Sequence, residues 1–161
     1  MKYKKIFNDI INDYYNGNDV IMFDLGDEIL VSSRSEVIYF IPKDKFLLDI
    51  DKFKLSYTKR MEISNIIRNA ISETDYVDAS GTPEIVKVAV ENGEEVYLRL
   101  SNWNDYCIAY VDKRLLSNFN NPEFKIKYEG NYVMVYEKSP KTGKYVRVAS
   151  VEARLFCQGG N

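Results

Sequence analysis

Apolar residues near the start of the chain recur at intervals of three and four positions, which is the spacing of one face of a helix. The run ends at Asn16-Gly17, a frequent signal for a helix C-terminus. A second stretch, over about residues 58–74, shows the same spacing, with Ser56 or Thr58 as its cap. The apolar positions are Tyr3, Ile6, Phe7, Ile10, Ile11 and Tyr14 in the first stretch and Met61, Ile63, Ile66, Ile67, Ala70 and Ile71 in the second. The pattern predicts two longer amphipathic helices.

Elsewhere the pattern changes to short apolar runs and to alternation with a period of two, as expected for strands. Asn92-Gly93 is the strongest hairpin signal, because it joins two alternating segments. Pro42 predicts the first turn of a short helix, and Asp112 is placed to cap another. The predicted strands cover residues 20–25, 29–31, 37–41, 84–91, 96–101, 106–111, 124–128, 132–137 and 145–157.

Together these elements predict one α+β domain over residues 1–161. Antiparallel hairpins and a C-terminal β-meander would pack against the two longer helices. Residues 38–47 weakly resemble residues 108–116. This similarity has two explanations. One is duplication of a hairpin–helix unit, about residues 18–54 and 84–125; the other is a chance repeat of a common strand–helix pattern. The sequence leaves both explanations open.

The amino-acid composition limits the catalytic and metal-binding chemistry that is available to the chain. The chain has 161 residues, of which 45% are apolar and 29% charged, as in soluble globular proteins. It contains no histidine, which excludes a Ser-His-Asp catalytic triad, a Cys-His catalytic dyad and any zinc site that needs histidine. Cys107 and Cys157 are isolated in apolar runs, so we expect buried, reduced thiols. With no signal peptide and no spanning apolar run, the sequence predicts a cytoplasmic protein without a membrane partner.

The net charge of −2 conceals two regions of opposite sign. Residues 73–95 carry seven carboxylates against the single cation Lys87, a net charge of −6, whereas residues 122–157 have a net charge of +3. The carboxylates of this acidic window are Glu73, Asp75, Asp78, Glu84, Glu91, Glu94 and Glu95. They fall largely at element ends and at the hairpin tip, so they are candidates for an acidic surface that docks on a basic partner. The alternative is an ordinary solubilising surface.

Catalytic candidates are few. Asp112 lies eleven residues before Glu123-Phe124-Lys125, and an acidic residue followed by such a triplet is how many Mg²⁺-dependent nucleases hold metal. The competing interpretation gives Asp112 the role of a helix cap. Because acids and lysines are abundant, one or two such triplets are expected by chance, and we expect no bound metal or other cofactor.

The C-terminal meander alternates tyrosines with basic residues, a composition that single-strand-binding sheets use to stack bases and neutralise phosphates. The basic candidates are Lys125, Lys127, Lys141, Lys144 and Arg147. Three tyrosines of this region, Tyr128, Tyr132 and Tyr136, are in strand phase with apolar neighbours and are expected to be core residues. Direct nucleic-acid binding is therefore the less favoured prediction.

The overall composition, rich in Lys, Asn, Asp, Ile and Tyr and poor in Pro, His and Trp, resembles that of proteins from low-GC bacteria and their phages. Small proteins of that composition without catalytic motifs are often accessory proteins that bind another macromolecule. The leading prediction is a non-enzymatic binding protein, such as an anti-CRISPR-like phage or mobile-element inhibitor of a host defence nuclease, acting through the acidic window. Its partner would be a protein, for example one that itself binds nucleic acid. The alternatives are a Mg²⁺-dependent nuclease and a single-strand binder.

Overall fold

A computed structural model describes residues 1–33, 36–53, 68, 72–128 and 131–154. Strands hold 47% of these residues and helices 18%. The first elements are helix α1 (Tyr3–Tyr15), strands β1 (Val20–Asp24), β2 (Glu28–Ser33) and β3 (Val37–Pro42), and 3₁₀ turns η1 (Lys43–Lys45) and η2 (Ile50–Lys52). The remainder are β4 (Tyr76–Asp78), β5 (Glu84–Val90), β6 (Gly93–Ser101), β7 (Ile108–Asp112), α3 (Lys113–Leu116), β8 (Glu123–Lys127), β9 (Tyr132–Lys138) and β10 (Tyr145–Glu152).

Seven strands form one antiparallel sheet in the order β1-β2-β3-β10-β9-β8-β4. The predicted meander over residues 20–41 is confirmed as β1, β2 and β3, in which Val31 pairs with both Met22 and Tyr39. The predicted C-terminal meander is confirmed as β8, β9 and β10. Pairing of β10 with β3, at Ala149 and Tyr39, joins the two meanders into one sheet.

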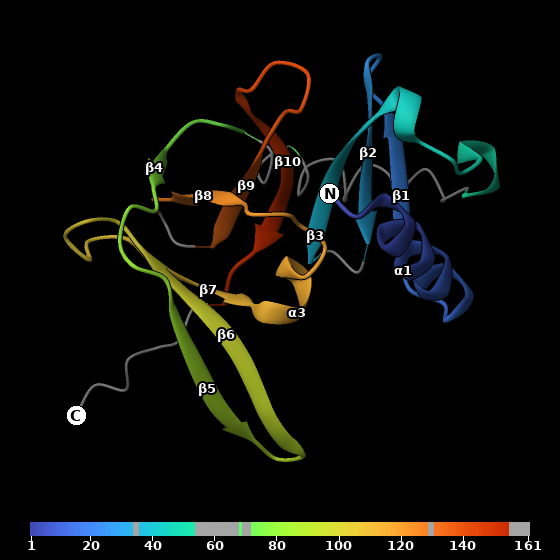
Figure 1. Cartoon of the computed structure of the whole chain (residues 1–161). Helices are drawn as coiled ribbons and strands as arrows, with labels where there is room; N and C mark the ends of the chain where they lie inside the picture. The colour runs from blue at the N-terminus through green and yellow to red at the C-terminus, as the bar shows by residue number, and fades with distance from the viewer. Residues whose placement is uncertain (34–35, 54–67, 69–71, 129–130, 155–161) are drawn as a thin grey trace.

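The other three strands form a second antiparallel sheet in the order β5-β6-β7. Its first two strands are the hairpin predicted at Asn92-Gly93, with Val90 paired to Gly93. Figure 1 shows this hairpin projecting away from the rest of the molecule. The base of the hairpin belongs to the core, since Leu100 of β6 is buried there beside Ala109 of β7, but the tip extends into solvent.

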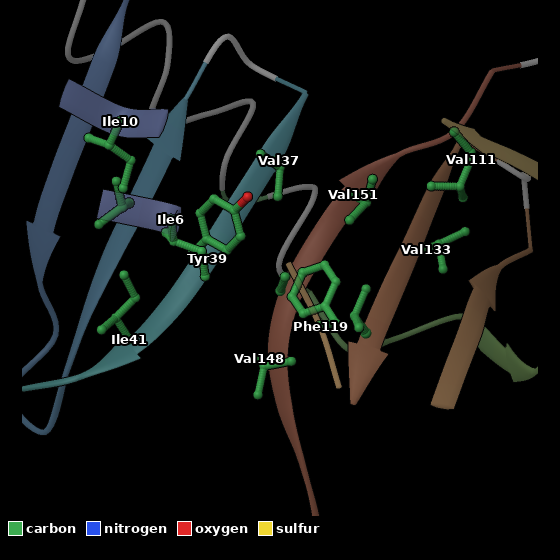
Figure 2. Packing of buried hydrophobic residues seen from close by; sticks show 14 of the residues in the cluster. Ile6, Ile10, Val37, Tyr39, Ile41, Val111, Phe119, Val133, Val148 and Val151 are labelled. Carbon is green, nitrogen blue, oxygen red and sulfur yellow. The ribbon is translucent and has the colours of Figure 1, made fainter. Parts of the chain in front are cut away.

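The main core lies between α1, the seven-stranded sheet and the base of the second sheet. Ile6 and Ile10 of α1 pack close to Tyr39 and Ile41 of β3, and Phe119 lies beside β10 (Figure 2). A smaller cluster uses the opposite side of the strands, because successive side chains alternate between faces. Its buried members are Ile21, Leu30, Ile38, Phe40 and Met134. Several strands are consequently buried on both faces, which explains their continuous apolar runs.

The α+β prediction, with hairpins and a meander packed against two longer helices, is wrong. The described residues are mostly strand, and only α1 among the described helices exceeds four residues. The helix expected over about residues 58–74 lies almost entirely outside the described residues. Around Pro42 the chain forms the two 3₁₀ turns in place of the expected short helix. Strand exceeds helix because the apolar residues that alternate with a period of two outnumber those at helical spacing.

Two local predictions are confirmed. The Asp112 carboxylate caps α3 by accepting a hydrogen bond from the Arg114 backbone N–H. Cys107 is free and buried, and burial raises the pKa of its thiol. Cys157 lies outside the described residues.

Candidate functional site

The longest strand at a described sheet edge is β5. The four edge strands are β1, β4, β5 and β7. Strand β4 has only three residues, β1 begins with two buried residues, and β7 meets Arg154 at Tyr110 along its outer side. Strand β5 has seven residues and none of them is buried. A long exposed edge is a template for pairing with another chain, and most proteins shorten or cover such edges.

The side chains of β5 are mostly apolar on both of its faces. Ile85 and Ala89 share one face with Lys87, while three valines and Glu84 occupy the other. Ile85 is 59% exposed and Val90 is 40% exposed. A two-sided apolar strand usually belongs to the middle of a sheet, where both faces are covered. Here it forms the rim, which leaves apolar surface and backbone polar groups exposed together.

The register shows which backbone groups of β5 point away from β6. Val90 and Gly93 flank a two-residue turn and pair with each other. The pair that closes such a turn is hydrogen-bonded, and hydrogen-bonded pairs then alternate along an antiparallel ladder. Ile85, Lys87 and Ala89 are the out-of-phase residues, so their N–H and C=O groups point outward. Three donors and three acceptors thus face the open edge.

Carboxylates surround the far half of the hairpin. Glu94 pairs with Lys87 at 3.0 Å. Glu95 accepts hydrogen bonds from the Tyr97 hydroxyl and, at 3.2 Å, from Arg154. Glu91 is exposed in the turn itself and has no hydrogen-bond or ion-pair partner among the described residues. The one cation of β5 is therefore already paired within the hairpin, and the tip presents an excess of negative charge.

The opposite end of β5 adjoins the loop over residues 102–106. The Gly81 N–H donates to the Ser101 carbonyl at 2.9 Å, and a Cβ on Gly81 would lie 2.4 Å from the Ser101 Oγ. Arg99 spans this end by pairing with Glu84 at 3.7 Å and with Asp105 at 3.4 Å. The close approach explains the glycine and fixes the loop beside the start of the strand.

Exposed aromatic rings mark the same loop. Trp103, the only tryptophan, is 82% exposed, and Tyr106 is 70% exposed. The Tyr106 hydroxyl lies 2.6 Å from that of Tyr128, which follows β8 in the other sheet. Tyr128 is 55% exposed, so the expectation that it is a core residue is wrong. Tryptophan and tyrosine are the residues most enriched at the energetic centres of protein interfaces.

The structure separates the acidic window into two regions. Glu73, Asp75 and Asp78 lie beside β4 in the seven-stranded sheet, whereas Glu91, Glu94 and Glu95 lie at the tip of the projecting hairpin (Figure 1). Glu84 lies at the base of β5, between the two. In the first region, Glu73 pairs with Arg147 at 3.6 Å and Asp78 with Lys125 at 3.8 Å. Glu94 and Glu95 of the hairpin are paired as well, with Lys87 and Arg154, so the two regions differ in their place in the fold and not in the engagement of their carboxylates.

The basic candidates of the meander are largely engaged within the fold. The Lys125 ammonium lies 5.3 Å from the centre of the Tyr136 ring, and that of Lys127 lies 5.9 Å from the Tyr132 ring. The Arg147 guanidinium packs 4.3 Å from Phe40 and also pairs with Glu28. Tyr132 and Tyr136 are half-buried, as expected for residues packed against the smaller core cluster. Lys141 and Lys144 lie in the exposed β9–β10 loop, where Lys141 is 3.9 Å from Asp44.

The residues of the nuclease hypothesis lie on different sheets. Asp112 ends β7 of the three-stranded sheet, whereas Glu123 and Lys125 belong to β8 of the seven-stranded sheet. Although partial burial opposes ionisation, the hydrogen bonds and charge of Arg114 keep the pKa of Asp112 below its usual value. Within the described part of the chain, no group of three or more Cys, Asp or Glu side chains is close enough to hold a metal ion.

A polar cleft of about 590 Å³ lies between α1, β3 and α3. Its wall contains Tyr39, whose phenol has a pKa raised to about 12 by burial. The buried Asn118 amide donates to the Tyr39 hydroxyl at 2.9 Å and to Asp9 at 3.4 Å. Asp13 accepts a hydrogen bond from Ser33 at the same place. These contacts connect α1 to the sheet, so the polar groups have a structural role.

Sequence reasoning missed the edge position of β5 and the aromatic loop. Both were visible as apolar residues, but the strand order that leaves β5 at the rim follows from pairings far apart in the chain. Trp103, in the sequence Asn102-Trp103-Asn104-Asp105, offered one usable signal, since an apolar ring among turn-forming residues is expected to be exposed.

Comparisons with known proteins give no further assignment. No family model matches the chain, and no curated protein or solved structure shows a significant match to it. In the residues that the structure covers, no helix combines the length and the apolar character needed to cross a membrane.

Proposed function

We propose that this chain is a non-enzymatic, cytoplasmic protein-binding module whose docking element is the β5–β6 hairpin. The observation that supports this most is β5 itself, an outermost strand of seven residues with no buried side chain and apolar residues on both faces. Exposed apolar surface of this kind is typical of interaction sites. The glutamates of the hairpin tip retain the acidic contact first expected for the whole window.

The narrower expectation, an anti-CRISPR-like inhibitor of a defence nuclease from a phage or mobile element, is one form of this proposal and rests on composition. It specifies a partner protein that binds nucleic acid and therefore carries basic surface. Glutamates at a projecting tip suit such a partner by electrostatic steering.

The test begins with affinity capture from a low-GC bacterial lysate, after which the captured protein is purified and its binding measured by calorimetry. Ile85→Lys and Val90→Lys each place a charge in the exposed apolar surface of the hairpin, and we expect each to weaken binding at least tenfold. Leu47→Lys is the matched control, because Leu47 is 80% exposed and lies between η1 and η2, outside the hairpin.

Two results contradict the proposal. In one, every purified partner binds the hairpin variants as tightly as the original chain. In the other, the protein cleaves DNA or RNA with Mg²⁺ and Glu123→Ala abolishes the cleavage.

A further inference from the structure

We infer that the partner supplies an extended segment that pairs with β5 as a fourth strand of the small sheet, and that this segment carries Lys or Arg at its ends. The inference rests on the proposed function and specifies the chemistry of the occupant. Strand addition of this kind obtains affinity from backbone hydrogen bonds and selectivity from alternate side chains.

The backbone argument comes from the register of β5. Ile85, Lys87 and Ala89 direct their N–H and C=O groups away from β6, as derived above from the pairing of Val90 with Gly93. An added strand would satisfy these groups in one continuous ladder. The seven residues of β5 span about 23 Å at roughly 3.3 Å per residue, so the occupant needs a comparable extended length.

Side chains decide the composition expected for the middle of the occupant. Ile85 and Ala89 on one face, and the valines on the other, offer apolar neighbours to both faces of an added strand. Lys87 interrupts this surface, but its ammonium is held by Glu94 at 3.0 Å. Apolar or β-branched residues are therefore favoured at the centre of the occupant.

The charged groups near the two ends of β5 decide which residues are expected at the ends of the occupant. At the hairpin tip Glu91 is exposed and unpaired among the described residues. Glu94 pairs with Lys87, so two carboxylates there face one cation. At the other end the carboxylates of Glu84 and Asp105 share the single cation Arg99, and the side chain of Glu84 is 62% exposed. The loop of Trp103 adds an exposed aromatic ring that attracts cations. Both ends of the edge thus favour a positive group, and an acidic segment would be repelled from the tip.

The experiment uses the full chain and synthetic peptides, with binding followed by peptide anisotropy and by the fluorescence of Trp103. One peptide alternates Val and Thr between terminal Arg pairs; a second replaces each Arg with Glu; a third carries a central Pro. We expect only the first to bind, and its affinity to fall as salt rises, because exposed charges are screened beyond about 10 Å at 0.1 M salt.

Variants of the chain separate backbone pairing from charge. Ala89→Pro removes an outward N–H without removing a β5–β6 hydrogen bond, so we expect at least a tenfold loss of affinity for the basic peptide. Ala89→Ser keeps that N–H and should stay within twofold of the original chain. Glu91→Gln combined with Glu94→Gln should weaken binding severalfold and flatten its salt dependence. Circular dichroism of each variant confirms that the sheet has formed.

Three outcomes overturn the inference: no peptide binds, the acidic peptide binds as well as the basic one, or Ala89→Pro leaves affinity unchanged. Self-association that Ala89→Pro abolishes overturns it too, since the occupant is then a second copy of this chain. The proposed function survives these failures if Ile85→Lys still releases the purified partner, because the hairpin then binds through a face and not through its edge. If Ile85→Lys and Val90→Lys have no effect on any partner, the proposed function itself fails.

Discussion

Tyr39 illustrates how single residues join elements in this fold. Its ring is buried beside Phe119, and its hydroxyl accepts a hydrogen bond from Asn118 in the wall of the polar cleft. Burial raises the pKa of Tyr39 to about 12, and burial raises the pKa of Tyr76 to a similar value on the other side of the sheet. Both phenols are therefore held in the neutral form well beyond the pH at which an exposed tyrosine ionises, which is near 10.

This produces a specific dependence of stability on pH. A raised pKa means that the folded chain keeps protons that the unfolded chain loses, so the contribution is complete below about pH 10. It is then lost as pH rises from about 10 to 12, by up to about 1.4 kcal/mol per pH unit for each such tyrosine. We expect urea unfolding to show a steep fall in the free energy of unfolding over that interval.

Substitution isolates the contribution of Tyr39. Tyr39→Phe should reduce the slope above pH 10 while lowering stability at pH 7 by about 1–2 kcal/mol, because the buried Asn118 amide loses the nearer of its two acceptors. Tyr15→Phe serves as the control, since Tyr15 is 82% exposed and should change neither quantity. An unchanged alkaline slope in Tyr39→Phe would show that ionisation of Tyr39 is not coupled to unfolding.

At the scale of elements, the β5–β6 hairpin is the part whose form depends most on local chemistry. Its turn needs Gly93, which adopts a φ of +144° that side chains strongly disfavour. A Cβ at this position would meet no atom within 4 Å, so the glycine is required by the backbone and not by lack of space. The Asn-Gly pair in the sequence therefore carried real information about this turn.

Gly93→Ala should consequently weaken the hairpin without damaging the core. We expect a cost of about 1–3 kcal/mol from the strained backbone, expressed mainly as faster hydrogen exchange of the β5 and β6 amides near the tip. Amides of β3 and β10, in the middle of the large sheet, should exchange at unchanged rates. Asn92→Ala is the control, because Asn92 does not adopt a positive φ. Equal acceleration in both sheets would mean that the hairpin unfolds only with the whole molecule.

At the scale of the whole molecule, the question is how a three-stranded sheet is fixed to a seven-stranded one. Arg154, just beyond β10, provides one direct connection. Its backbone N–H donates to the Tyr110 carbonyl at 2.8 Å, and its guanidinium lies 5.5 Å from the centre of the Tyr97 ring while pairing with Glu95 at 3.2 Å. One residue thus contacts both β6 and β7.

Removing the Arg154 side chain should loosen this connection while keeping its backbone hydrogen bond. Cation–π contacts at partly exposed sites contribute about 0.5–1 kcal/mol, which corresponds to a fall in Tm of roughly 1–4 °C for a chain of this size. Arg154→Ala should show that fall in a thermal unfolding scan. Arg154→Lys retains the charge but not the planar group, and should give an intermediate value. A Tm identical to that of the original chain would mean that packing at the base of the sheet holds the two sheets together unaided.

Local order could largely be predicted from sequence. The helix at residues 3–15, the meander over residues 20–41, the turn at Gly93 and the cap at Asp112 all follow from signals within a few residues of each other. The proportion of helix to strand was predicted wrongly. An α+β fold was inferred from helical spacing, whereas most apolar residues of the described part belong to strands. Whether the resemblance between residues 38–47 and 108–116 reflects duplication stays open.

The candidate site was predictable only in part. Sequence reasoning identified Glu91, Glu94 and Glu95 but grouped them with Glu73 and Asp78, which the fold places beside another sheet. Carboxylates of both groups pair with basic residues. Lys125 and Arg147 likewise look available in sequence, yet they pack on aromatic rings and pair with acids. Ion pairing depends on which strands become neighbours, and a charge count along the chain does not contain that information.

What the sequence determined by itself was local conformation and chemical scope: where the chain turns, which residues alternate, and that no histidine is present for catalysis or metal binding. Tertiary structure alone decided that Ile85, Val86, Val88 and Val90 lie on an open rim and not in the middle of a sheet. The physical reason is that strand pairing is set by contacts distant in the chain. An apolar strand has the same local pattern whether or not a neighbour covers its second edge, and here no described strand does.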